Sequence, residues 1–333
     1  MKRCSRWCLL ILVLLLCLCG CARQAAAPGA GIRTLPPASF SVAVLRGPTA
    51  LGAVKLLEDN PSLGEGVTTS YLVLDSPDQA IAKLLSGEVN VAALPTNLAA
   101  TLYNKGVPLQ LAAMSSWGVL YLLSNGIAVN NTGDLQGKTI YVVGQGTTPD
   151  FVLRYVLKNS GIDPDRDVML NYSMDQVEAA QSLIAGRIGL AVLPEPWVTQ
   201  ALMGSSNVRV VMDLQQEWRR TQAQPGALAQ TCLVIRDNLS RSRPDAVGKF
   251  LDDYAGSIDW VVKNPAAAGV LAEKHGLGMR AAVAERAIPR CNLRYESAAG
   301  SKDDVIAFLK VLYGFDPRSV GGKLPDDGFF YQK

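Results

Sequence analysis

The sequence predicts an α/β protein of two lobes, each built around a sheet of mostly parallel strands. The first observation is an internal repeat, because residues 87–95 and 186–194 both follow the pattern G-x-[VI]-x-[VL]-A-x-L-P at an offset of 99 residues. At the same offset, residues 41–49 align with residues 140–148, and two matches at one offset indicate a duplicated unit. Strand-like and helix-like stretches also alternate along the chain, as in parallel sheets whose strands are joined by helices. A chain of 333 residues is long enough for two domains.

Residues 1–20 have the features of a secretory signal peptide. Three basic residues lie within the first six, and residues 9–18 form an apolar stretch too short for a stable transmembrane helix. The end of this segment resembles a bacterial lipobox, with Gly20 directly before Cys21. The resemblance implies cleavage before Cys21 and acylation of its thiol, which would anchor the chain to a membrane. The alternative is an ordinary signal peptide in which Cys21 has no special role.

The segment after the leader, residues 21–39, is rich in Ala, Pro and Gly and predicts a flexible tether. Loss of residues 1–20 removes three positive charges and no negative ones from a formal net charge of +3, so the remaining chain is close to neutral. A neutral chain argues against nucleic acid as a partner, since a surface that follows phosphates needs a basic excess. Beyond Cys21 the chain retains Cys232 and Cys291. An exported compartment allows a disulfide between them, and buried free thiols are the alternative.

Apolar runs that end at turn residues predict the strands, and apolar residues at helical spacing predict the helices. The expected strands cover residues 41–46, 68–74, 89–94, 109–114, 119–123, 126–129, 139–143, 168–172, 188–193, 208–212 and 228–236. The expected helices cover residues 51–57, 78–87, 96–105, 149–159, 176–185, 197–203, 246–262, 265–274, 280–287 and 303–313. Residues 215–224 are expected as a polar connection, and residues 321–333 as an extended surface segment.

Individual residues justify these elements in chain order. Apart from Asn90, residues 89–94 are apolar, as expected for a strand covered on both faces. Gly87 and Gly106 each follow a helical pattern and can end it in a left-handed conformation. Pro149 suits the first position of a helix, where no N–H donor is needed. From Pro244 onward the pattern is helical, and these helices are expected to pack on the first lobe.

This order of elements takes the chain from one lobe to the other and back. Lobe I is predicted to comprise residues 40–115 and 228–333, and lobe II residues 116–227. The two crossing segments are expected near residues 114–123 and 227–235.

The same pattern predicts where a ligand would bind. In parallel α/β sheets ligands gather outside the carboxyl ends of the strands, and the glycine turns and proline stops of both repeats lie at such ends. Helix starts carry unpaired N–H groups that suit an anionic group, while glycine allows close approach and threonine adds a hydroxyl. The candidate ligand-binding residues at these positions are Arg46, Gly47, Pro48, Thr49, Thr96, Asn97, Gln145, Gly146, Thr147 and Thr148. The alternative for each is turn formation or helix capping.

Further candidates border the predicted cleft. Trp197, and Trp117 with Ser116 beside it, would supply aromatic walls that favour a planar or cationic ligand group. Glu195 would accept from an amine or ring N–H of the ligand, and Arg46 would pair with an acid group. The alternatives are packing beneath the hinge for the tryptophans, a carboxylate stabilised by the helix dipole for Glu195, and a surface position for Arg46.

Other motifs fail on inspection. Residues 137–139 resemble the end of a P-loop, but Thr132 replaces its first glycine and a strand follows. Residues 144–149 begin like a dinucleotide-binding turn, but Pro149 replaces the third glycine. The single histidine, His275, lies at a predicted helix end away from the cleft, which disfavours a Ser-His-Asp triad. With so few soft ligands, no metal site and no cofactor are expected.

Taken together, these features resemble the solute-binding lipoproteins of ABC importers. The resemblance rests on the lipobox, the two-lobed order, and the motifs Asp-Leu-Gln-Gly-Lys-Thr at 134–139, Ser-Leu-Ile-Ala-Gly at 182–186 and Leu-Pro-Glu-Pro-Trp at 193–197. It covers about residues 40–315 and is similar to the nitrate/sulfonate/taurine and thiamine-precursor group. The resemblance implies the type II periplasmic-binding-protein fold, with two hinge crossings and the ligand between the lobes. A clear nitrate- or sulfonate-type signature is absent.

The resemblance implies capture of a small anionic or zwitterionic solute, aromatic ones included, by closure of two lobes about a hinge. A membrane permease with its cytoplasmic ATPase would receive the closed complex, and no catalytic residue is expected because no bond is made or broken. The chain would act as a monomer on the extracytoplasmic face of a bacterial membrane. Two alternatives remain: an enzyme of the thiamine-pyrimidine-synthase type, which needs a histidine in the cleft, and a ligand-sensing lipoprotein.

Overall fold

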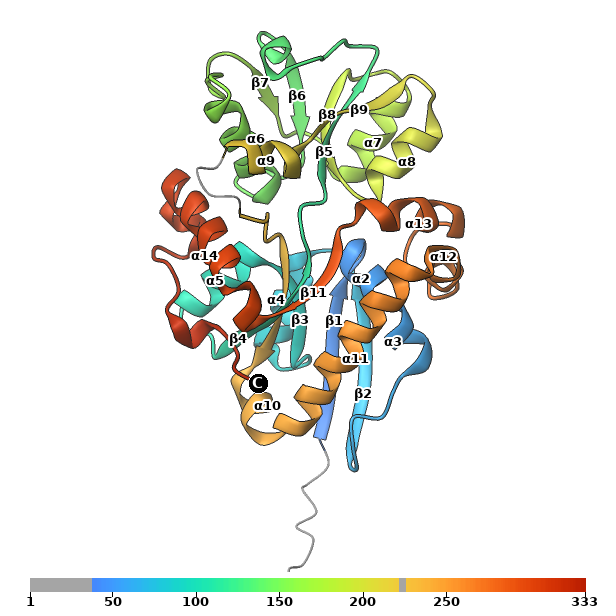
Figure 1. Cartoon of the computed structure of the whole chain (residues 1–333), viewed down its shortest axis with the longest axis vertical. Coiled ribbons are helices and arrows are strands. Elements are labelled where there is room, and N and C mark those ends of the chain that lie inside the picture. The colour runs from blue at the N-terminus through green and yellow to red at the C-terminus, as the bar shows by residue number, and fades with distance from the viewer. Residues whose placement is uncertain (1–37, 222–225) are drawn as a thin grey trace, which may run out of the picture. The chain divides into compact units, whose positions relative to one another are not determined.

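Two β-sheets with flanking helices form the part of the chain that the computed structural model describes, residues 38–221 and 226–333 (Figure 1). The signal peptide and Cys21 lie outside these residues. The larger sheet contains, in spatial order, β11 (Leu293–Ser297), β4 (Leu109–Ser116), β10 (Thr231–Arg236), β3 (Val91–Pro95), β1 (Ala38–Leu45) and β2 (Val67–Leu74). The smaller sheet contains β7 (Met169–Asn171), β6 (Thr139–Val142), β8 (Leu190–Pro194), β5 (Leu120–Asn125) and β9 (Val208–Asp213). Because β1 begins at Ala38, the last two residues of the predicted tether belong to the sheet.

The two sheets share one strand order, as expected for a duplicated unit. β2-β1-β3 and β7-β6-β8 are parallel triplets, and β10 and β5 add to them antiparallel, followed by β4 and β9. The sheets are therefore mixed, and the expectation of mostly parallel sheets was wrong on this point. The reason lies in the connections, since β5 and β10 enter each sheet at the edge where the neighbouring parallel strand ends. A strand that enters there can only run in the opposite direction.

Helices cover both sheets, and local chemistry accounts for many of their ends. For example, α4 (Pro77–Ser86) begins after Ser76, whose side chain accepts from the N–H of Gln79, and ends at Gly87, whose φ is 83°. The other helices before β10 are α2 (Pro48–Gly52), α3 (Val54–Asp59), α5 (Thr96–Asn104), α6 (Thr148–Asn159), α7 (Gln176–Ile184), α8 (Trp197–Gly204) and α9 (Leu214–Thr221). The later ones are α10 (Asp237–Ser242), α11 (Pro244–Lys263), α12 (Pro265–Lys274), α13 (Ala281–Ala287) and α14 (Ala298–Phe315). No helix in the described ranges is long and apolar enough to cross a membrane.

Several elements differ from the expectation from sequence. Residues 126–129, expected as a strand, are a bend at Gly126 followed by irregular chain. Ser124 holds this segment, because its hydroxyl donates to the carbonyl of Ile127 and accepts from its N–H. The expected polar connection contains α9. This helix was not predicted, because only Leu214 and Trp218 on its buried side are large and apolar. α10 and β11 were not predicted, because they are short and contain too few apolar residues to show a period.

The C-terminal segment is buried at its end, so the expectation of a surface segment was wrong. Phe329 is fully buried and Phe330 nearly so, and the rings of Phe329 and Tyr103 lie 5.2 Å apart. The main chain joins the larger sheet, since the N–H of Tyr331 donates to the carbonyl of Leu111 at 2.8 Å. A pair of aromatic residues in a polar tail carries too little periodicity to predict this docking from sequence.

We call the six-stranded sheet with α2–α5 and α10–α14 the first lobe, and the five-stranded sheet with α6–α9 the second lobe. The chain crosses from β4 to β5 and returns between β9 and β10, which gives the two crossings expected for the fold. The crossing segments contact each other, because the N–H of Gly118 donates to the carbonyl of Leu228 at 3.0 Å. Cys232 and Cys291 are free and buried.

The late helices do not pack on the first lobe alone. Phe308 and Phe315 of α14 contact the second lobe, where the ring centroids of Trp218 and Phe308 lie 5.8 Å apart and those of Tyr155 and Phe315 lie 6.2 Å apart. On another side α13 contacts α8. The lobes therefore meet through an aromatic cluster as well as through the crossings.

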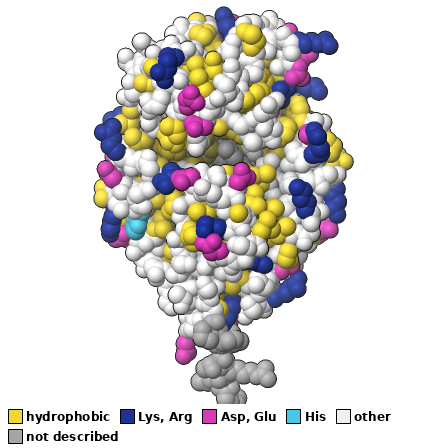
Figure 2. Space-filling model, turned by 180° about the vertical axis from the view of Figure 1, so that it is seen from behind, with side chains coloured by type: hydrophobic (Ala, Val, Ile, Leu, Met, Phe, Trp, Pro, Cys, Tyr) yellow, Lys and Arg dark blue, Asp and Glu magenta, His cyan; other side chains and the backbone are white. Residues whose placement is uncertain are grey.

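Acidic and basic side chains are interspersed on the face that Figure 2 shows. Ion pairs one helical turn apart also occur on the helices, such as Lys249 with Asp253 and Lys263 with Asp259. Exposed pairs of this kind each contribute only about 0.3–0.5 kcal/mol to stability.

We predict that Phe329→Ala lowers the free energy of unfolding by about 3–5 kcal/mol, because it leaves a cavity where a fully buried ring packs. Chemical denaturation measures the difference. Tyr313→Ala is the matched control, since Tyr313 is 38% exposed and its loss should cost less than about 1 kcal/mol. Equal costs for the two variants would show that the C-terminal segment does not contribute to the core.

Candidate functional site

A pocket of about 310 Å³ lies where the carboxyl ends of the repeated strands of both lobes meet. Leu45 and Pro95 end β1 and β3 in the first lobe, and Val143 and Pro194 stand at the corresponding ends of β6 and β8 in the second. We call this the lobe pocket. Its lining residues are Leu45, Arg46, Asp75, Pro77, Pro95, Asn97, Leu98, Leu120, Val143, Gly144, Gly146, Thr147, Thr148, Pro149, Gln176, Pro194, Gln230 and Thr231.

The structure brings part of the candidate set together in the lobe pocket. Its lining includes Arg46, Asn97, Gly146, Thr147 and Thr148. The candidates outside the lining are Gly47, Pro48, Thr49, Thr96, Ser116, Trp117, Gln145, Glu195 and Trp197. Sequence reasoning missed Asp75 and Gln176, although Asp75 directly follows β2 and Gln176 begins α7. The strand-end and helix-start rule could have identified both.

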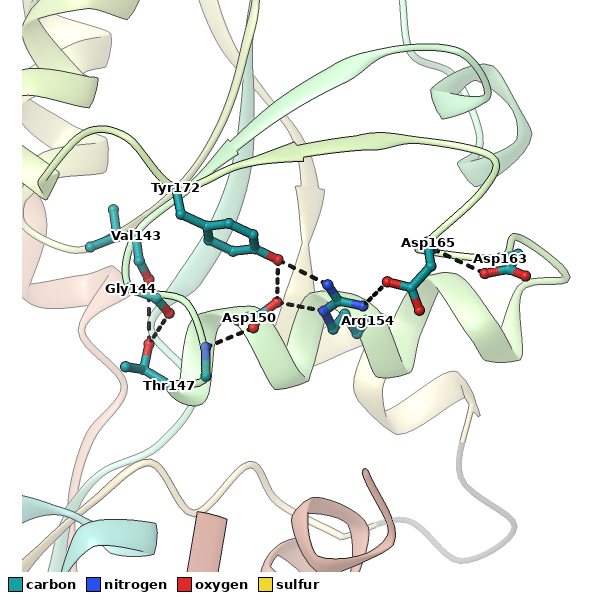
Figure 3. Close-up of polar contacts among 9 residues, drawn as sticks. Val143, Gly144, Thr147, Asp150, Arg154, Asp163, Asp165 and Tyr172 are labelled. Carbon is teal, nitrogen blue, oxygen red and sulfur yellow. Dashed lines mark hydrogen bonds and ion pairs between the residues drawn. The ribbon is translucent and has the colours of Figure 1, made fainter. Parts of the chain in front are cut away.

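The turn between β6 and α6 is held by a buried carboxylate of its own helix (Figure 3). Gly144 and Gly146 have φ values of 74° and 71°, which glycine adopts without strain. Asp150 accepts from the N–H of Gly146 at 2.8 Å, from Arg154 Nε at 2.8 Å and from the hydroxyl of Tyr172 at 2.7 Å. The amide of Gly146 is therefore occupied by Asp150, which also places a negative charge at the start of α6.

Asn97 and Thr148 join the two lobes at the pocket. The side-chain nitrogen of Asn97 donates to the carbonyl of Ser319 at 3.3 Å, so its oxygen faces the second lobe. That oxygen accepts from the hydroxyl of Thr148 at 3.3 Å, and both residues are buried. These two polar side chains bond each other across the lobes.

The hydroxyls of the first-lobe threonines also contact groups of the protein itself. Thr49 donates to the carbonyl of Leu45 at 2.7 Å and accepts from the N–H of Leu45 at 2.9 Å. Thr96 is fully buried, with its hydroxyl 4.0 Å from the sulfur of Met114. Both fit the alternative of turn formation and capping better than direct ligand contact.

Among the described residues, Arg46 is the only basic one in the lining. Its Nε lies 2.7 Å from Asp75 Oδ1, and its Nη1 donates to the carbonyl of Gly276 at 2.7 Å. The expected partner of Arg46 was an acid group of a ligand, and the carboxylate of Asp75 occupies part of that role. The charged content of the lobe pocket is thus a neutral pair.

The predicted aromatic walls lie elsewhere. Trp117 is buried, donates from its ring nitrogen to the carbonyl of Arg294 at 3.1 Å, and lies beneath the guanidinium of Arg294 at 4.2 Å. Trp197 packs against the core of the second lobe. The lining contains leucine, valine and proline in place of aromatic rings, so its apolar part is aliphatic.

Glu195 is buried and turned into its own helix. Its carboxylate accepts from the N–H and the hydroxyl of Thr199 at 3.1 and 3.0 Å. Burial raises the pKa of Glu195 to about 7, while the bonds to Thr199 and the charge of Arg290 act in the opposite direction. This geometry assigns Glu195 to the start of α8, where it stabilises helix N–H groups, and not to the lining of the lobe pocket.

Comparison with known proteins identifies the family to which this chain belongs. A sequence model of the NMT1-like family matches residues 64–274, which is more than half of the chain. The chain belongs to the NMT1-like family. No curated protein matched it in a sequence comparison.

Solved structures share the fold of this NMT1-like protein. A protein from Parabacteroides distasonis described as an ABC transporter is 34% identical, with 89% of this chain and 99% of that chain covered and a TM-score of 0.77. The periplasmic aliphatic sulphonate binding protein of Escherichia coli is 14% identical, with 89% and 92% covered and a TM-score of 0.69. The alkanesulfonate-binding protein of Xanthomonas axonopodis pv. citri is 15% identical, with 87% and 96% covered and a TM-score of 0.62. The fold class expected from the sequence is confirmed.

The single histidine of this NMT1-like protein lies outside the lobe pocket. His275 follows α12, and its Nε2 lies 2.8 Å from Glu58 Oε2, beside the ion pair between Lys274 and Glu58. A thiamine-pyrimidine-synthase type of enzyme would need a histidine between the lobes. The placement of His275 gives that alternative no support.

We predict that Glu195→Gln removes a pH-dependent loss of stability. Because the folded-state pKa of about 7 exceeds the ordinary 4.5, the folded protein binds this proton more tightly than the unfolded chain. The wild type should therefore lose up to about 3 kcal/mol relative to the variant as pH rises from below 4.5 to above 7. Denaturation of both proteins at pH 5 and pH 8 tests this. A gap that stays constant, or that favours the wild type at pH 8, would contradict it.

Proposed function

We propose that this NMT1-like protein is the extracytoplasmic solute-binding lipoprotein of an ABC importer. The observation that supports it best is the lobe pocket, which both lobes line with the ends of their repeated strands. A site divided between two lobes can enclose a ligand when the lobes approach. The solved structures of similar fold that are described as sulphonate-binding proteins support the same role.

The proposed ligand is a small anionic or zwitterionic solute. The pocket volume of about 310 Å³ is at the lower end of the range of ligand pockets, which favours a small molecule. The first turn of α5 borders the pocket through Asn97 and Leu98, and its N–H groups have no partner within the helix. Such N–H groups favour an anionic group of the ligand.

The proposed mechanism is closure of lobe I, residues 40–115 and 228–333, against lobe II, residues 116–227. The crossing segments would act as the hinge, where the N–H of Val119 donates to Gln230 Oε1 at 3.0 Å. The bond between Asn97 and Thr148 already joins the lobes in this structure, and closure would enclose the solute within the rest of the lining. A permease with its ATPase would then receive a monomer in this closed form, and no residue would act as a catalyst.

We predict that the protein purified from its native host carries a small molecule, because a closed lobe pocket retains its solute. Mass spectrometry of the denatured protein identifies it. Leu98→Trp should weaken its binding by more than about tenfold, since an indole would fill much of the pocket. Met203→Trp is the control, because Met203 is 40% exposed on α8, outside the lining. Equal retention by both variants would contradict the assignment of the site.

We also propose that residues 1–20 are a signal peptide, that residues 21–37 are a tether and that Cys21 carries the lipid. Cys21→Ser is predicted to move the protein from the membrane fraction to the soluble fraction, because acyl chains give the membrane affinity. Fractionation of cells followed by immunodetection measures this. Cys19→Ser, which leaves the Gly20-Cys21 pair intact, should stay with the membrane. A Cys21→Ser variant that remains in the membrane fraction would rule out this anchor.

A further inference from the structure

The lobe pocket contains two charged side chains, which are paired with each other. Among the described residues of its lining only Arg46 and Asp75 carry a charge, and Arg46 Nε lies 2.7 Å from Asp75 Oδ1. They follow β1 and β2, which are parallel neighbours, so both side chains start from the same edge of the first sheet. The N–H of Arg46 also donates to the carbonyl of Leu74 at 2.8 Å, which extends the pairing of the two strands to this point. The pocket therefore holds a dipole without net charge.

Arg46 is held in place, whereas the side chain of Asp75 is 68% exposed, and each keeps one open side. Arg46 Nη1 donates to the carbonyl of Gly276, and Gly278 lies so close that a Cβ there would be 2.8 Å from Arg46 Cδ. The main chain of Asp75 is fixed by Gln79, whose Oε1 accepts its N–H at 3.2 Å. Within the described chain no partner bonds Arg46 Nη2 or Asp75 Oδ2. The pair thus presents N–H donors and a carboxylate oxygen side by side.

We propose that Arg46 and Asp75 together recognise a zwitterionic head group, in which an ammonium and a carboxylate or sulfonate are separated by a short linker. The inference rests on the proposed solute-binding function. The acid group binds Arg46 Nη2, and the ammonium binds Asp75 Oδ2. A simple anion at Arg46 Nη2 is attracted by the guanidinium and repelled by the neighbouring carboxylate of Asp75, which lowers its net attraction. A head group with both charges gains from both partners, which makes the pair a determinant of specificity.

The other lining residues determine which kind of group can be attached to the zwitterionic head group. Leu98, Leu120 and Val143 line the pocket with four prolines, and no aromatic side chain belongs to the described lining. The described lining therefore cannot stack on an aromatic ring of a ligand, but it can make apolar contacts with an aliphatic chain. The ligand class assigned by these residues is a small aliphatic zwitterion.

Calorimetric titration of the full chain with matched pairs of compounds tests this assignment. The zwitterions are leucine, valine, β-alanine and taurine, and their partners without the amino group are isocaproate, isovalerate, propionate and ethanesulfonate. The expected result is that at least one zwitterion binds at least tenfold more tightly than its partner. Tighter binding of a partner, or no binding of any zwitterion, overturns the assignment. Binding of a partner compound would still leave the solute-binding function standing.

Asp75→Asn tests the residue itself. The substitution removes the acceptor of the ammonium and also frees Arg46 from its carboxylate. The preference for the bound zwitterion should therefore fall by about tenfold or reverse in favour of its partner. Asp78→Asn is the matched control, an exposed carboxylate in the first turn of α4 outside the lining, and should keep the preference. An unchanged preference in Asp75→Asn, with the protein folded as judged by circular dichroism, overturns the role of Asp75.

Discussion

The whole site is positioned by main-chain pairing between strands. Each of the two crossing strands pairs with a strand that ends in proline. Leu120 at the start of β5 pairs with Pro194, and Thr231 at the start of β10 pairs with Pro95. Each crossing strand thus enters its sheet at the carboxyl end of a parallel neighbour. All four residues line the lobe pocket, because the edges at which the chain enters the two sheets are the edges that face each other. The location of the site is therefore set by main-chain strand pairing, and not by the side chains that could contact a ligand.

Around this frame, most polar residues with suitable chemistry serve the fold. Thr49 bonds the end of β1, Asp150 holds the turn before α6, and Glu195 holds the start of α8. A buried polar group without a partner costs about 1–3 kcal/mol, so a fold that places such groups near a strand end must also satisfy them. The groups left with open donors or acceptors at the pocket are few, and Arg46 and Asp75 are the charged ones.

A neutral, aliphatic pocket between two lobes also fits the task of a transport protein. Such a protein must hold its solute and then release it, which contacts distributed over both lobes allow when the lobes move apart. The lobes already touch through Asn97 and Thr148 and through the ring of Phe308 against Trp218. Movement between the lobes would therefore exchange contacts within the protein for contacts with the solute.

From the sequence alone, the offset of 99 residues, the apolar runs and the glycine and proline stops already predict two related α/β units and a cleft at their strand ends. Each of these features can be seen within a short stretch of sequence, because the spacing of apolar residues shows which side of a helix or strand is buried. The direction of β5 and β10, the docking of Phe329 and the residues that line the pocket appear only in the tertiary structure. Their physical cause is pairing over long separations, as when Asn97 bonds Ser319, 222 residues away, and Thr148, 51 residues away. No local pattern encodes which polar group will meet such a partner and which will remain free for a ligand.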